Sequence, residues 1–131
     1  MNLIKVKYKY LNSKQQENYN FHKIASGLAE FGFNSIRLTD DYQGADFIAI
    51  HIDGEQLLKV QLKGRLTIDK KYLQKEIYIA FIEDGVMKLY DHDFIVSKLK
   101  TNILQSKSWS EKGIYHWGKT PSYYEKFITK L

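Results

Sequence analysis

The segment GADFIAIHIDGEQLLKVQLKGR, Gly44–Arg65, decides the fold. Apolar residues dominate Ala45–Ile52, and such a run predicts a well-buried strand. The pair Asp53–Gly54 tolerates the positive φ that a two-residue turn requires, so the chain is expected to reverse there. The segment Glu55–Lys63 follows with alternating polar and apolar residues at its end, and it predicts a second strand antiparallel to the first.

This predicted hairpin brings polar side chains together at the end opposite its turn. A two-residue turn pairs Ile52 with Glu55, and the same register places Asp46 opposite Gln61. Gln61 and Lys63 are two positions apart in one strand, so their side chains share a face about 7 Å apart. A carboxylate, a carboxamide and an ammonium group are therefore expected to meet there.

The residues around the hairpin predict one helix before it and a mixture of strands and helices after it. Apolar residues recur at helical spacing over Ser13–Phe31, and Gly32 is placed to end that helix. The other predictions are strands at Asn34–Leu38, Ile77–Ile82 and Val86–Tyr90, a turn at Asp40–Gly44, a loop at Ser106–Lys119, and helices from Asp91 to about Leu104 and from Thr120 onward. Leu66–Glu76 shows no clear pattern. This order favours an α/β domain with one central mixed sheet flanked by helices.

The composition limits the class of protein. The chain has 131 residues, of which 44% are hydrophobic and 15% aromatic, which fits one globular domain over residues 1–131. The absence of cysteine excludes disulfide frameworks and thiolate zinc sites. The N-terminal MNLIKVKYKY alternates charged and apolar residues, and no run approaches the roughly 20 apolar residues of a membrane span. We expect a cytoplasmic protein with no membrane partner.

The net charge of +5 is unevenly distributed. The segment Asp40–Glu55 carries five acids and no Lys or Arg, whereas Lys59–Lys75 carries six bases and one acid. Such neighbours suit a protein that holds a cation beside a polyanion, although a solvated hairpin of mixed charge is an equally simple interpretation. The same two interpretations apply to the basic side chains Arg65, Lys70, Lys71 and Lys75, which could contact phosphates. The aromatic loop Trp109–Trp117 could stack on bases or anchor itself to the core.

The expected cluster suits the hydrolysis of a phosphodiester. A hard divalent cation takes oxygen ligands from a carboxylate, a carboxamide or backbone carbonyl, and water. It polarises a phosphoryl oxygen and helps to generate hydroxide, while a lysine can orient the attacking water or neutralise charge in the transition state. Asp46, Gln61 and Lys63 supply these groups.

With these residues in place, the chain resembles the PD-(D/E)XK nuclease superfamily, which has the restriction-endonuclease-like fold. In that family a metal-binding Asp begins the second strand, and a (D/E)-x-K or Q-x-K triplet ends the third. Asp46 matches the first position, and Gln61 and Lys63 match the glutamine variant of the triplet. The resemblance extends over about two thirds of the chain, Tyr19–Tyr90.

Two features depart from the family pattern, and either of two further acids could compensate. Alanine precedes Asp46 where the family has proline, and the neutral Gln61 removes one negative charge from the metal site. Many members supply a glutamate from the first helix, and Glu17 lies on the apolar stripe of Ser13–Phe31 at its open end. Asp41 is a second candidate ligand, although it could simply shape the turn.

The resemblance implies a Mg²⁺- or Mn²⁺-dependent endonuclease that hydrolyses DNA phosphodiester bonds at Asp46, Gln61 and Lys63, with Glu17 as a further metal ligand. A chain of this length has little room for a separate recognition domain, so cleavage of both strands would need a homodimer. The alternative is a weakly active or inactive nuclease-like module that binds nucleic acid or a protein, with Gln61 as the mark of a weakened site.

Overall fold

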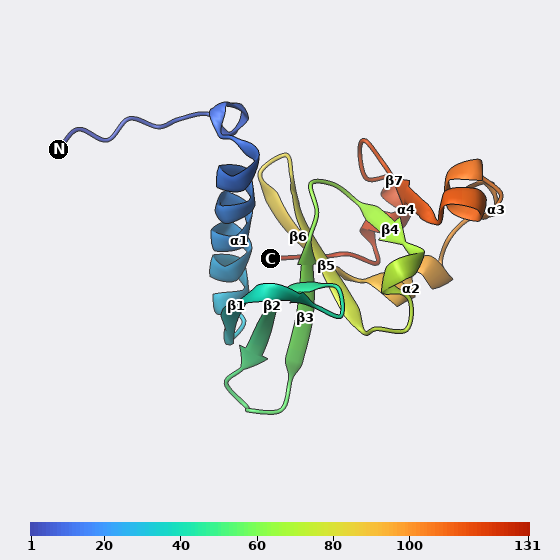
Figure 1. Cartoon of the computed structure of the whole chain (residues 1–131), viewed down its shortest axis with the longest axis horizontal. Helices are drawn as coiled ribbons and strands as arrows, with labels where there is room; N and C mark the ends of the chain where they lie inside the picture. Colours follow the sequence, from blue (N-terminus) through green and yellow to red (C-terminus); the bar gives the residue numbers. More distant parts are fainter.

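The computed structural model describes residues 1–131. A six-stranded sheet lies at its centre, with α1 on one side and the later helices on the other (Figure 1). In chain order the elements are η1 (Tyr8–Tyr10), α1 (Ser13–Ala29), β1 (Phe33–Tyr42), β2 (Ala45–His51), β3 (Leu57–Leu62), β4 (Thr67–Asp69), η2 (Lys70–Tyr72), β5 (Ile77–Glu83), β6 (Val86–Asp91), α2 (His92–Ser97), α3 (Thr101–Leu104), η3 (Ser108–Lys112), β7 (Ile114–His116), α4 (Ser122–Glu125) and β8 (Thr129–Lys130).

The sheet is mixed, which confirms the predicted α/β class. Its strand order is β1-β2-β3-β5-β6-β8, and every neighbouring pair is antiparallel except β3 and β5. The parallel pair requires a crossover, and the chain makes it through β4 and η2. β4 pairs separately with β7 in a small second sheet. None of the helices is long and apolar enough to cross a membrane.

Helix α1 begins with a capping box and packs on one face of the sheet. The Asn12 side chain accepts the N–H of Gln15, and the Gln15 side chain accepts the N–H of Asn12. Its apolar stripe packs against β2, β3, β5 and β6 in one core cluster, whose buried members are Phe21, Ile24, Leu28, Phe47, Ala49, Val60, Ala80 and Leu89. The helix ends two residues before the predicted Phe31, and the turn that follows uses Gly32 at φ +84°.

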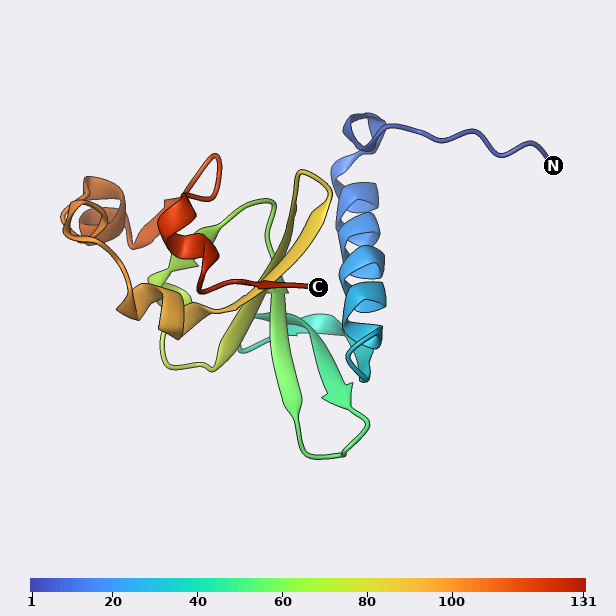
Figure 2. The same cartoon turned by 180° about the vertical axis from the view of Figure 1, so that it is seen from behind.

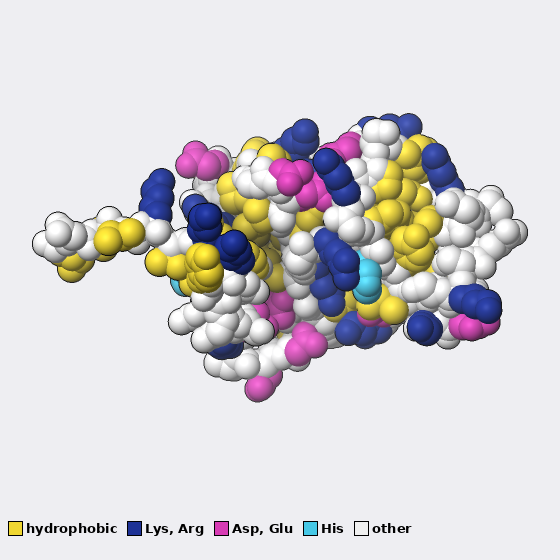
Figure 3. All heavy atoms as spheres, turned by 90° about the horizontal axis from the view of Figure 1, so that it is seen from above, with side chains coloured by type: hydrophobic (Ala, Val, Ile, Leu, Met, Phe, Trp, Pro, Cys, Tyr) yellow, Lys and Arg dark blue, Asp and Glu magenta, His cyan; other side chains and the backbone are white.

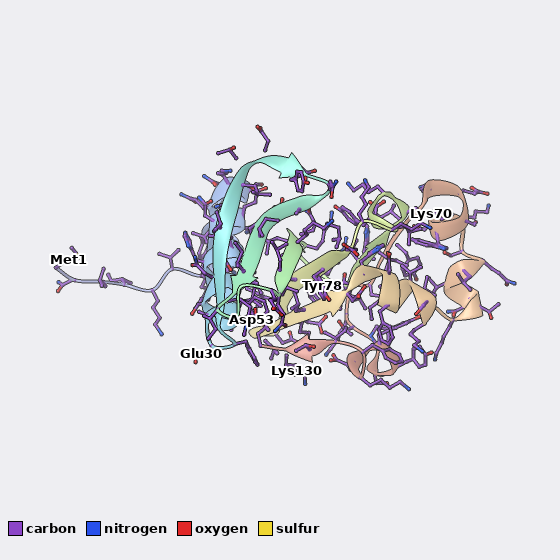
Figure 4. All side chains as sticks on the ribbon, turned by 90° about the horizontal axis from the view of Figure 1, so that it is seen from below. Met1, Glu30, Asp53, Lys70, Tyr78 and Lys130 are labelled. Atoms are coloured by element: carbon purple, nitrogen blue, oxygen red, sulfur yellow. The ribbon has the colours of Figure 1, made fainter.

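The β2–β3 hairpin has the predicted register but a longer loop. Phe47 pairs with Val60 and Ile50 with Leu57, the register that a two-residue turn would give. The strands separate before Asp53, however, so the loop spans residues 52–56. The Asp53 carboxylate stabilises this loop by accepting the N–H groups of Glu55 and Gln56. The loop adjoins the turn after α1, because Ile52 donates its N–H to the Gly32 carbonyl, and in the view from below Asp53 lies near Glu30 (Figure 4).

Strand β1 is longer than predicted and lies at one edge of the sheet. It continues through the predicted turn as far as Tyr42, and only Gln43 and Gly44, both at positive φ, connect it to β2. Its pairing with β2 changes register between Arg37 and Tyr42. This irregularity leaves residues 38–41 outside the ladder next to Asp46 at the start of β2, while Tyr42 pairs again with Ala45.

The C-terminal half covers the opposite face of the sheet, seen from behind in Figure 2. The single helix predicted over Asp91–Leu104 is two short helices, α2 and α3. The predicted loop contains a π-helical turn and β7, and both of its tryptophans are buried in the second core cluster. The predicted final helix stops at Glu125, and the chain then pairs with β6 as β8. Trp109 and Trp117 therefore anchor this segment to the core.

Candidate functional site

The hairpin register determines where the predicted site lies. Phe47 and Val60 are the last paired residues of β2 and β3, so Asp46 and Gln61 are the next facing positions. The Asp46 carboxylate accepts the backbone N–H of Leu62 at 2.8 Å, which ties the start of β2 to the end of β3. The Gln61 amide nitrogen donates to the carbonyl of Leu62 at 3.2 Å, and its oxygen is left available.

Asp46, Gln61 and Glu17 line one hollow of about 270 Å³. They come from β2, β3 and α1, which meet where β2 begins and β3 ends. Glu17 is largely exposed, and its carboxylate lies 3.4 Å from the Lys14 ammonium. The remaining lining residues are Lys14, Arg37, Leu38, Thr39, Asp40, Asp41 and Leu62. We call this space the acidic hollow.

Negative charge accumulates around Asp46. Burial raises the pKa of the Asp46 carboxyl, and the charges of Asp41 and Glu17 raise it further. The Leu62 N–H and the ammonium of Lys63 oppose this increase without cancelling it. The protein alone therefore does not fully compensate the Asp46 charge, and a cation in the acidic hollow would be attracted.

Lys63 lies between the acidic hollow and a neighbouring one. It does not line the acidic hollow, but its charge acts on Asp46, and its ammonium lies 5.4 Å from the centre of the Tyr72 ring. Burial lowers the pKa of Lys63, as does the nearby charge of Lys71, while Asp69 and Asp46 oppose the decrease. Lys63 thus releases a proton more readily than a lysine in water.

Tyr72 is a site residue that the sequence did not indicate. Its side chain is 2% exposed, and the ammonium groups of Lys63 and Lys71 lie 5.4 Å and 5.1 Å from its ring centre. Its ring packs so closely on Gly44 that a Cβ there would lie 2.9 Å from the Tyr72 ring. Tyr72 belongs to Leu66–Glu76, where no periodicity was available to identify it.

The basic residues predicted to bind nucleic acid are exposed and occupy different surroundings. The Lys70 ammonium lies 5.2 Å from the Trp109 ring centre, and the Lys71 ammonium lies 3.8 Å from Asp69. Arg65 and Lys75 form no ion pair. Their exposure leaves all four side chains accessible to a polyanion.

The acids of the acidic hollow lie too far apart to form a metal site from charged ligands alone. No three His, Asp or Glu side chains lie close enough together to hold an ion. Asp46 is the half-buried acid, whereas Glu17 and Asp41 are exposed at the rim. A cation here would require neutral oxygen ligands as well, and the amide oxygen of Gln61 is one candidate.

The comparisons with known proteins reveal a likeness of fold. No protein-family model matches the chain, and no curated protein matches it in sequence. Among solved structures, that of a bacterial homing endonuclease, I-Ssp6803I, matches with a TM-score of 0.53 and 12% sequence identity. The match covers 89% of this chain and 86% of the homing endonuclease. The chain therefore has a fold similar to that of a homing endonuclease over most of its length.

Proposed function

We propose that the protein is a metal-dependent DNA endonuclease of PD-(D/E)XK type with the restriction-endonuclease-like fold. The observation that carries this proposal is that Asp46 and Gln61, next to the last pair of β2 and β3, line one hollow with Glu17 at its rim. The likeness of fold to a homing endonuclease supports it. Asp46, Gln61 and Lys63 are the proposed catalytic residues.

Mg²⁺ or Mn²⁺ is the cofactor that this proposal requires, and the donors suit a hard cation. Only one carboxylate oxygen of Asp46 accepts a hydrogen bond, so the other is free. Asp46, the amide oxygen of Gln61 and the Glu17 carboxylate would hold the metal. When bound, the metal supplies polarisation of a phosphoryl oxygen and a lower pKa for a coordinated water.

Lys63 is suited to act on the attacking water or on the phosphate. Its lowered pKa makes the neutral amine more accessible than in an ordinary lysine, so it can accept a proton from water. In its charged form it neutralises the negative charge that develops on the phosphate. Both roles require the Lys63 nitrogen to reach a water or phosphate beside Asp46, and the charge of Lys63 does act on that carboxyl.

DNA would approach across the exposed basic side chains beyond the hairpin. Arg65, Lys70, Lys71 and Lys75 would contact phosphates, which makes binding dependent on salt concentration. One site cuts one strand at a time, so cleavage of both strands would require two copies of the chain. We include a homodimer on DNA in the proposal for that reason.

A second candidate function is a nuclease-like module that binds DNA or a protein without cleaving it. The neutral Gln61 and the lack of a three-acid cluster favour this alternative. Both leave less negative charge for a divalent cation than a site with two buried acids would have.

Nicking of supercoiled plasmid in Mg²⁺ or Mn²⁺ separates the two functions. We expect the wild-type protein to nick, and Asp46→Ala and Lys63→Ala to lose at least a hundredfold in rate while DNA affinity stays largely unchanged. The control variants Glu111→Gln and Lys119→Ala remove exposed charges outside the site. Equal nicking by all variants, or none with either metal, would overturn the enzymatic proposal, and DNA binding without nicking would favour the module.

A further inference from the structure

A second hollow, of about 300 Å³, adjoins the site. It lies between η1 with the first half of α1, the end of β3 and the β5–β6 turn, and its lining residues are Tyr8, Tyr19, Asn20, Lys63, Gly64, Ile82 and Gly85. We call it the tyrosine hollow. It shares only Lys63 with the proposed catalytic residues. In the view from above, basic and hydrophobic side chains lie next to one another beside the base of the projecting N-terminal segment (Figure 3).

Two tyrosines form a fixed but exposed aromatic wall in this hollow. Tyr8 and Tyr19 pack edge to face, with ring centres 5.3 Å apart and planes at 62°. Asn20 donates to the Tyr8 hydroxyl at 3.0 Å, and Gln16 donates to the Tyr8 carbonyl at 3.2 Å. The two rings are nevertheless 40% and 41% exposed. Ordered aromatic faces open to solvent suit the stacking of a flat ligand.

The hollow also offers polar groups and positive charge. The Tyr8 hydroxyl accepts from Asn20 and keeps its own hydrogen to donate, and the side-chain oxygen of Asn20 is left as an acceptor. The Lys23 ammonium lies 5.5 Å from the Tyr19 ring centre, and Lys63 lines the hollow. This combination matches a nucleobase joined to a phosphate.

The glycine at the end of β3 leaves room for such a ligand. Gly64 is not at positive φ, so its backbone does not demand glycine, and a Cβ added there would meet no atom within 4 Å. A side chain at this position would enter open space at the border of the hollow without disturbing the fold. Gly64 therefore provides a way to obstruct the hollow while keeping both tyrosines.

We propose that the tyrosine hollow binds a nucleobase of the DNA strand that is cut, unstacked from its neighbours and placed against Tyr8 and Tyr19. This inference rests on the proposed nuclease function, because Lys63 lines the tyrosine hollow, acts through its charge on Asp46 in the acidic hollow, and would face the phosphate next to the bound base. A base can enter only where it is unpaired. The substrate class is therefore single-stranded, frayed or branched DNA.

Binding of a fluorescein-labelled single-stranded oligodeoxynucleotide without divalent metal tests this inference independently of cleavage. We expect Tyr19→Ala and Gly64→Val each to weaken binding about tenfold, in the lower half of the range for loss of one base–aromatic stack. Tyr19→Phe keeps the ring and should bind like the wild type. Tyr10→Ala, which removes an exposed tyrosine outside the hollow, is the matched control.

Photo-crosslinking of an oligonucleotide that contains 5-iodo-deoxyuridine locates the base, and the inference predicts adducts on Tyr8 or Tyr19. Adducts elsewhere, or binding unaffected by Tyr19→Ala and Gly64→Val, would overturn it while the nicking assay still decides the proposed function. Absence of any DNA binding would overturn both. A Tyr19-dependent affinity for thymidine monophosphate equal to that for the oligonucleotide would assign the hollow to free nucleotides and overturn the strand-binding inference.

Discussion

The carboxylate of Asp46 accepts the backbone N–H of Leu62 at 2.8 Å, and this contact joins the first residues of β2 to the last of β3. The contact holds Asp46 in place although burial and two neighbouring acids disfavour its charged form. The site is thus held in an electrostatically unfavourable state before any cation or phosphate arrives.

Asp46→Asn should make the metal-free protein more stable at neutral pH. The asparagine oxygen can still accept the Leu62 N–H, and the repulsion from Asp41 and Glu17 disappears. Because the folded pKa of Asp46 is raised, the folded state binds more protons than the unfolded state between the two pKa values. Wild-type stability should therefore fall relative to the variant as pH rises through that window, starting near pH 4.

Urea unfolding of both proteins at a series of pH values checks this expectation. At pH 3 the carboxyl is protonated in both states, and the difference between the two proteins should vanish. Added Mn²⁺ should stabilise the wild type more than the variant, because a ligand of the folded state shifts unfolding by mass action. A variant that is less stable at pH 7 and more stable at pH 3 would contradict the raised pKa.

Gln61→Glu should strengthen the binding of a divalent cation. The substitution places a second acid directly beside Asp46 at almost the same size, and closely spaced acids are what the acidic hollow lacks. It should also destabilise the metal-free protein, since two facing carboxylates repel one another. Calorimetric titration with Mn²⁺ measures the affinity, and Glu111→Gln is the control for an exposed charge change. Unchanged affinity would remove Gln61 from the metal site.

The sequence predicted where the candidate site lies, but not all of the residues that form it. Asp46 and Gln61 could be placed opposite one another because antiparallel pairing obeys simple spacing, and a longer loop left the register unchanged. Glu17 reached the same hollow because helical periodicity aims one stripe at the sheet. Tyr72 could not be found, because it arrives through a crossover whose path depends on tertiary contacts.

The C-terminal segment also shows that local periodicity does not determine which partners the chain finds. The apolar stripe of residues 123–131 favoured a helix, yet the chain after Glu125 runs beside β6, where Leu131 donates its N–H to Met87. The edge of β6 offered backbone hydrogen-bond partners, and the spacing of apolar residues along the chain cannot predict such partners. Trp109 and Trp117 lie in a segment that looked like a loop, although burial of their rings holds it on the core.

Lys88→Ala should destabilise the protein far from the site. The Lys88 ammonium is buried between Glu83 at 2.9 Å and Glu125 at 2.7 Å. Burial opposes its charge, but the hydrogen bonds to both carboxylates more than offset this effect and raise the pKa of Lys88. Truncation leaves Glu83 without its cation, and breaking a buried pair in this way costs about 3–5 kcal/mol.

Denaturant unfolding at pH 7 measures this cost, with Lys130→Ala as control because Lys130 is the exposed partner of Lys88 on β8. Since the folded pKa of Lys88 is raised, its contribution is complete below the unfolded value near 10.5 and is lost as pH rises through the folded value. Equal stability of Lys88→Ala and Lys130→Ala would show that the ion pairs contribute nothing.

Gly44→Ala should disturb both stability and the site. Gly44 adopts φ +91°, where a Cβ is strained, and that Cβ would lie 2.9 Å from the Tyr72 ring. The combined strain and contact should cost about 1–3 kcal/mol. Because Tyr72 lies beneath Lys63, displacement of the Tyr72 ring should also reduce nicking of plasmid under conditions where the variant is still folded.

Gly118→Ala is the control. Gly118 has no positive φ and has open space for a Cβ, so this substitution should change stability by less than about 0.5 kcal/mol. If Gly44→Ala matched that control in urea midpoint and nicking rate, the packing of Tyr72 on this turn would not be what supports the site.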